Sequence, residues 1–210
     1  MSHINITGIN HMISKALVKS IQQFKRQEVV TDNKLKSSIF VYMLSEEFRN
    51  LYGRKYKINV VGYDEKSRKR TPGEWMLDIA ITDVTIIEDS DKKISKGSIS
   101  YKMIWAIESE LNSGIKAFAD DFGKLLCVKS ENYLFLNGLN QKTEKGRLKY
   151  IKRRTATILE MKKDLNIVLN NYYLAFFPSP AKNNGESLWD NNSQEELLKM
   201  ITVVDLGKSM

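Results

Sequence analysis

Three acidic residues in this sequence lie within, or at the end of, apolar segments that are typical of β-strands. Residues 101–110 alternate as a strand does, so Glu108 and Glu110 project from one face, roughly 7 Å apart at Cα. Asp78 lies in the middle of the apolar run 74–87, where aspartate is disfavoured and rarely buried without a partner. Carboxylates buried side by side repel one another unless a cation lies between them. We therefore expect Asp78, Glu108 and Glu110 to gather around a divalent metal ion.

Carboxylate oxygens favour Mg²⁺ or Mn²⁺ over zinc, and the rest of the composition agrees with this choice. The chain has one cysteine, Cys127, and two histidines near its N-terminus, so neither a zinc site nor a disulfide framework is expected. It contains no Gly-x-Ser-x-Gly elbow and no phosphate-binding loop of the Gly-x-x-x-x-Gly-Lys-Ser/Thr type. A hard cation on carboxylates can bind a phosphate oxygen, activate a water and stabilise a leaving oxyanion. This chemistry suits phosphodiester hydrolysis.

Hydrophobic periodicity predicts a single α/β domain, residues 1–210, that positions these acids. The polar segment 88–97 predicts a hairpin that pairs the second and third strands antiparallel, and the order strand, helix, strand after it predicts a parallel pair. Asn137–Gly138 is expected to end the fourth strand, and 183–192 is expected to be a loop. Helices are expected at 2–28, 31–52, 115–126, 143–164 and after Ser193; strands are expected at 56–63, 74–87, 101–110, 132–136 and 172–177.

The chain carries a net charge of +8, which favours a polyanionic partner such as nucleic acid, although a lysine-rich solvated surface gives the same count. Two basic segments are candidates for contacts to a phosphate backbone. No apolar run approaches the ~20 residues of a membrane span, and no signal-peptide core is evident, so we expect a cytoplasmic protein without membrane contact. The candidate nucleic-acid-binding residues are Lys66, Arg68, Lys69 and Arg70 in a loop, and Arg147, Lys152, Arg153 and Arg154 in the helix 143–164.

With these residues in place, the chain resembles the PD-(D/E)xK nuclease superfamily, whose core has the restriction-endonuclease-like fold. That core is a helix, three antiparallel strands, a helix and a fourth strand parallel to the third, the order expected here from about 31 to 137. The remaining 141–210 would be a C-terminal elaboration, with additional helices at both ends. By this resemblance Asp78 is the acid on the second strand, and Glu108-Ser109-Glu110 stands for (D/E)xK, with Glu110 in place of the usual lysine.

The resemblance also implies roles for two residues on helices. Asp120-Asp-Phe-Gly-Lys124 is similar to an Asp-Phe-x-Lys pattern in nuclease-like families with a Glu-Ser-Glu strand, so Lys124 would supply the displaced cation. On a helical wheel Lys124 lies nearly opposite the apolar stripe, and Lys116, near the edge of the stripe, is the alternative. Glu47 shares a side of its helix with apolar residues, where it would lie at the rim or face a buried cation; the resemblance makes it a second metal ligand or a supporting acid.

The expectation is therefore a Mg²⁺-dependent endonuclease, acting on DNA in preference to RNA, with Asp78, Glu108, Glu110 and Lys124 as catalytic residues. Cutting both strands of a duplex generally requires two active sites, so a homodimer is a plausible assembly. Two other interpretations stay open. The chain could keep the fold and bind nucleic acid without cleaving it, since position 110 lacks lysine. It could also be a protein-interaction or regulatory domain whose positive charge only aids solubility.

Overall fold

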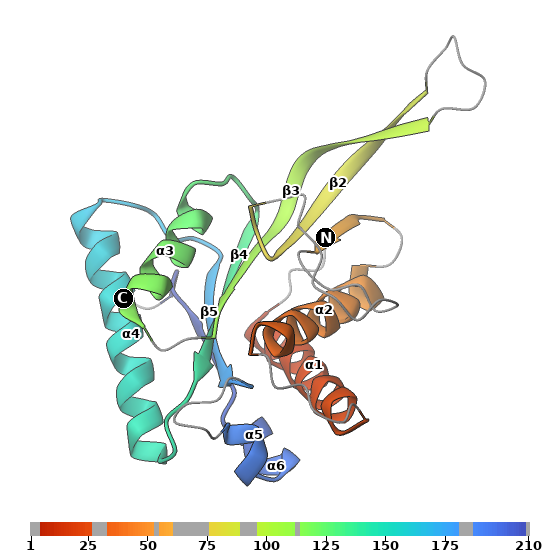
Figure 1. Cartoon of the computed structure of the whole chain (residues 1–210). Coiled ribbons are helices and arrows are strands. Elements are labelled where there is room, and N and C mark those ends of the chain that lie inside the picture. The colour runs from red at the N-terminus through yellow and green to blue at the C-terminus, as the bar shows by residue number, and fades with distance from the viewer. Residues whose placement is uncertain are drawn as a thin grey trace.

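A six-stranded mixed β-sheet lies at the centre of the molecule, as Figure 1 shows. The computed structural model describes residues 5–26, 33–52, 55–60, 76–88, 96–111, 114–180 and 187–208. The strands follow one another across the sheet in chain order: β1 (Lys57–Val60), β2 (Ile79–Glu88), β3 (Lys96–Glu110), β4 (Asn132–Leu139), β5 (Tyr172–Pro178) and β6 (Thr202–Asp205). Strands β1 to β3 are antiparallel, β3 to β5 are parallel, and β6 is antiparallel to β5. The predicted α/β class is confirmed.

Helices cover both faces of this sheet (Figure 1). On one face lie α3 (Ile115–Leu126) and α4 (Glu144–Asp164), each of which joins two parallel strands. On the other face lie α1 (Ile6–Arg26) and α2 (Asn33–Tyr52), while the short α5 (Leu188–Asn191) and α6 (Gln194–Lys199) lead into β6. One cluster of buried apolar side chains extends from α1 to the residue after β6, so the described elements share a core.

Aromatic side chains fix which residue of each strand faces which helix layer. Phe135 of β4 meets Phe118 and Phe122 of α3 edge-on, with ring centres 5.1 and 5.5 Å apart. Trp105 of β3 packs instead on Phe48 of α2, with ring centres 5.8 Å apart. Because strand side chains alternate between faces, an even-numbered position near the end of β3 faces α3 when Trp105 faces α2. This parity directs the acid at position 108 toward α3.

Strands β2 and β3 extend together well beyond the rest of the sheet as a two-stranded arm (Figure 1). The ladder runs from Ile79–Ile107 at the body of the protein to Glu88–Lys96 at the far end. The predicted antiparallel pairing of these strands is thus confirmed, as is the predicted parallel pairing of β3 with β4.

The structure differs from the predicted elements at several places. Asp78 is not in the middle of a strand: β2 begins after it, at Ile79. Strand β4 does not stop at Asn137–Gly138: both residues are buried, Asn137 pairs with β3 and β5, and Gly138 pairs with β5. The absence of a side chain on Gly138 is required there, since a Cβ atom would lie 2.9 Å from the Leu111 backbone. The expected loop 183–192 contains α5, and the tail forms β6, which was not predicted.

The C-terminal segment docks on the sheet through specific contacts. Trp189 donates a hydrogen bond from Nε1 to the carbonyl of Pro178 at 2.9 Å, so this ring is held on the body of the protein. Ser193 caps α6 by accepting from the Glu196 amide, and the Glu196 side chain accepts from the Ser193 amide in return. Within the described residues, no helix has the length and apolar character needed to cross a membrane.

Candidate active site

Glu108 is the most deeply buried acid of the predicted set, with a side chain only 1% exposed. It lies near the end of β3, opposite Phe135 of β4, on the face covered by α3. Burial, followed by the nearby charge of Asp78, raises the pKa of the Glu108 carboxyl to about 8. One of its oxygens, Oε1, is buried without a hydrogen-bond partner. A bound cation would give this oxygen a partner and offset the cost of burying a charged carboxylate.

The β2–β3 ladder begins with the pair Ile79–Ile107. Asp78 and Glu108 are the next residues beyond this antiparallel pair, so the two acids lie side by side. Oδ2 of Asp78 accepts two hydrogen bonds from Ser109, one from the amide at 2.9 Å and one from the hydroxyl. Burial nevertheless dominates these hydrogen bonds and raises the pKa of Asp78 above its ordinary value. Ser109 therefore fixes the orientation of Asp78 across the two strands, a function that the sequence pattern did not reveal.

Lys124 supplies the positive charge next to these acids. Its Nζ lies 3.2 Å from Oε2 of Glu108 and 2.7 Å from Oδ1 of Asp121. Burial lowers the pKa of the Lys124 ammonium, but the hydrogen bond to Asp121 and the charge of Glu108 outweigh it, so the pKa is raised overall. Lys116, the alternative cation, is exposed on the same helix. The structure thus places Lys124, and not Lys116, beside Glu108.

The orientation of α3 explains how Lys124 reaches the sheet although the helical wheel places it far from the predicted stripe. The apolar residues of this helix begin with Ile115, but Ile115 is 54% exposed, and the buried residues are Phe118, Phe122 and Leu125. At 100° per residue, this shifts the buried face toward the flank that carries Asp121 and Lys124. Both side chains are partly buried, so the long lysine side chain can reach β3.

The acids do not form a triad around one point. No three His, Cys, Asp or Glu side chains among the described residues, Glu110 included, are arranged to hold a metal ion together. Glu110 is half-buried at the end of β3, where its carbonyl accepts a hydrogen bond from Nδ2 of Asn137 at 3.1 Å. Two carboxylates with the orphaned Oε1 of Glu108 still fit Mg²⁺, which usually keeps several waters and takes only one or two protein carboxylates.

Glu47 lies apart from this cluster. Its helix, α2, covers the opposite face of the sheet from α3 (Figure 1), and its side chain is 5% exposed. There it forms ion pairs with two lysines of α1: Lys19 donates to Oε1, and Lys15 lies 3.9 Å from Oε2. The sequence left two possibilities for Glu47: a place at the rim, or a place facing a buried cation. Glu47 does face positive charge, which the lysine side chains of the neighbouring helix α1 supply.

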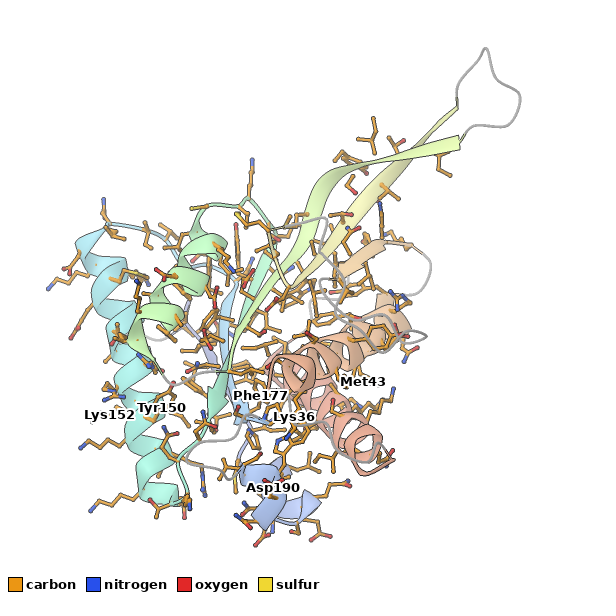
Figure 2. The ribbon with its side chains drawn as sticks, in the orientation of Figure 1. Lys36, Met43, Tyr150, Lys152, Phe177 and Asp190 are labelled. Atoms are coloured by element: carbon orange, nitrogen blue, oxygen red, sulfur yellow. The ribbon has the colours of Figure 1, made fainter. Side chains whose placement is uncertain are left out.

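The predicted basic residues of α4 divide into exposed and buried ones. Lys152 and Arg153 are exposed, and Figure 2 shows Lys152 on the outer side of α4, away from the sheet. Arg147 is half-buried and donates to two carbonyls before the helix. Arg154 was wrongly assigned to the phosphate-contacting surface: it is 2% exposed, with its guanidinium carbon 4.6 Å from the Phe118 ring centre. The loop residues Lys66, Arg68, Lys69 and Arg70 lie outside the described residues.

Asp121 is a member of the cluster that the sequence reasoning did not assign. It occurs three residues before Lys124, a spacing that places two side chains on one flank of a helix, so the signal was present in the sequence. Asp121 also contributes to the electrostatics, since its charge raises the pKa of both Asp78 and Glu108.

Comparison of the chain with protein-family models, with curated proteins and with solved structures finds no match. We therefore infer the function from the site itself.

Proposed function

We propose that this protein is a metal-dependent nuclease that hydrolyses phosphodiester bonds in nucleic acid, with DNA as the favoured substrate. One observation carries the proposal: Asp78 and Glu108, from the adjoining ends of two antiparallel strands, lie together in a buried site with the ammonium of Lys124. Carboxyl groups whose pKa values are raised by burial next to a specific charged partner mark candidate functional sites, and carboxylate oxygens suit hard cations such as Mg²⁺.

The order of elements around this site supports the same proposal. Helix α2, antiparallel strands β1 to β3, helix α3 and parallel strand β4 follow one another in the chain. This is the order that a resemblance to the PD-(D/E)xK superfamily implies, and the cluster lies where that resemblance expects the catalytic acids. Because one fold serves many functions, the site residues carry more weight in the proposal than the order of elements.

In this proposal, Asp78 and Glu108 would hold Mg²⁺ or Mn²⁺, with Ser109 keeping Asp78 oriented. The ion would supply Lewis-acid polarisation of a phosphate oxygen and a lowered pKa for the attacking water. Lys124, already partly exposed, would donate to the phosphate and stabilise the charge that develops on it. Glu110 would orient the attacking water or complete the ligand set.

The exposed side of α4 would contact the nucleic-acid backbone. This helix lies on the same face of the sheet as α3 (Figure 1). Its exposed basic residues include Lys145, Lys149, Lys152 and Arg153. Such contacts fix a duplex without reading its sequence. A homodimer would be the assembly for cleaving both strands, and light scattering with and without duplex DNA measures it.

A plasmid-nicking assay with Mg²⁺ tests the proposal. We expect the wild-type protein to relax supercoiled DNA, and EDTA, Asp78→Asn or Glu108→Gln to slow this about 10²-fold or more. Asp83→Asn is the matched control, because Asp83 is a half-buried acid of β2 that pairs with Lys102 and whose Oδ1 accepts from the Val84 amide. Nicking that survives Asp78→Asn unchanged would refute the assignment of this site.

A second candidate function is nucleic-acid binding without cleavage. It is favoured by the position of Lys124, whose ammonium already neutralises Glu108, together with the carboxylate of Glu110 where the superfamily usually has lysine. If Mg²⁺- and Asp78-dependent nicking is absent while DNA retention falls steeply with salt, this second function is supported. Retention that is absent, or indifferent to salt, supports the protein-interaction alternative instead.

A further inference from the structure

The ammonium of Lys124 lies between two carboxylates that come from different elements. Glu108, on β3, is almost fully buried and lies 3.2 Å from Nζ. Asp121, on the same helix as Lys124, is 21% exposed and lies closer, at 2.7 Å. The shorter contact is thus made by the carboxylate that the proposed metal site does not use.

These two contacts would respond differently to a metal ion. A divalent cation on Glu108 would draw on the same carboxylate that now accepts from Lys124, and it would repel the ammonium. Asp121 lies one helical turn before Lys124, on the same flank of the helix. The proposed metal site does not use its carboxylate, which therefore stays available to accept from the ammonium. Without Asp121, a flexible lysine that is 36% exposed would be free to turn into solvent.

From this geometry we propose that Asp121 is a positioning residue that keeps the Lys124 ammonium at the phosphate when Glu108 binds metal. The inference rests on the proposed nuclease function and adds a residue to it. Asp121 would not touch the substrate: it acts only through Lys124, so its effect depends on the presence of that lysine.

A double-mutant cycle in the nicking assay tests this dependence. We expect Asp121→Asn to lower the rate at saturating DNA about 10-fold, the size typical of residues that support a ligand or catalytic group, with little change in the DNA concentration for half-maximal rate. In a Lys124→Ala background, Asp121→Asn should have no further effect. The matched control is Asp120→Asn, which alters the adjacent exposed acid of the same helix. Equal rates for Asp121→Asn and Asp120→Asn, or full additivity with Lys124→Ala, would overturn the proposal.

A second measurement does not need catalysis and so separates this inference from the proposed function. The rate at which Lys124 is acylated by an amine-reactive ester can be followed by mass spectrometry, with Mn²⁺ present and with it chelated. Asp121→Asn should raise this rate several-fold relative to the wild type with Mn²⁺ present, and by less with it chelated, because Glu108 then still accepts from Lys124. Asp120→Asn should leave the rate unchanged under both conditions. If the protein proves inactive but this result holds, the nuclease function fails while the anchoring contact stands. An unchanged acylation rate in Asp121→Asn refutes the anchoring contact whatever the activity.

Discussion

Replacing Glu108 by glutamine should make the protein more stable at alkaline pH when no metal is present. The substitution keeps the shape of a side chain that is 1% exposed and removes its titratable proton. Burial, and then the charge of Asp78, raises the pKa of Glu108 from 4.5 in the unfolded chain to about 8 in the folded protein. The folded state therefore holds this proton more tightly than the unfolded state does.

The sign and size of the effect follow from this difference. Below pH 4.5 both states are protonated, and Glu108 costs no stability. Between pH 4.5 and about 8 the unfolded chain releases the proton while the folded protein keeps it, so stability falls as the pH rises. Each unit of pKa corresponds to about 1.4 kcal/mol, so the full cost above pH 8 is at most about 5 kcal/mol. Glu108→Gln removes this cost, and the gap between the two proteins should widen steadily across this pH range.

Urea denaturation in EDTA at pH 5, 7 and 9 measures the gap. Asp78 is present in both proteins, so the difference between them reports on Glu108. We expect nearly equal free energies of unfolding at pH 5 and a higher value for Glu108→Gln at pH 9. Parallel pH profiles for the two proteins would show that Glu108 is not buried in the folded state, and the proposed metal site would lose its main support.

Four further predictions concern the metal site and other parts of the structure. Mg²⁺ at about 100 times its dissociation constant should stabilise the wild type by about 2.7 kcal/mol at pH 8, but not Glu108→Gln, as thermal melts can show. Arg154→Ala should lower the free energy of unfolding by about 2–4 kcal/mol, because it empties a buried space between aromatic rings, while Lys152→Ala should change it by less than about 0.5 kcal/mol. Lys152→Ala should instead reduce the salt slope of DNA binding by about 1, measured by fluorescence anisotropy. Gly138→Ala should cost about 1–3 kcal/mol in urea titrations, since its Cβ would lie 2.9 Å from the Leu111 backbone.

Local patterns predicted most of the elements correctly because each pattern is satisfied within a few residues. The helix at 143–164 begins and ends as expected, with Thr143 as its cap, since capping and periodicity are local properties. Asn137–Gly138 misled the same reasoning: this pair favours a turn in isolation, but here it is buried and hydrogen-bonded between neighbouring strands. Tertiary packing overrode the local preference, as it also did for the short strand β6.

The sequence determined the residue types of the candidate site, and the tertiary structure decided which of those residues lie together. Spacing alone determined that Glu108 and Glu110 share a face of one strand, because alternation is a property of the strand itself. It could not determine that Lys124 reaches Glu108, that Asp121 joins the cluster, or that Glu47 pairs with lysines on the opposite face of the sheet. Those outcomes depend on the rotation of α3 against β3 and on the face of the sheet that α2 covers. Both are decided by the packing of aromatic side chains between layers, among residues far apart in the chain.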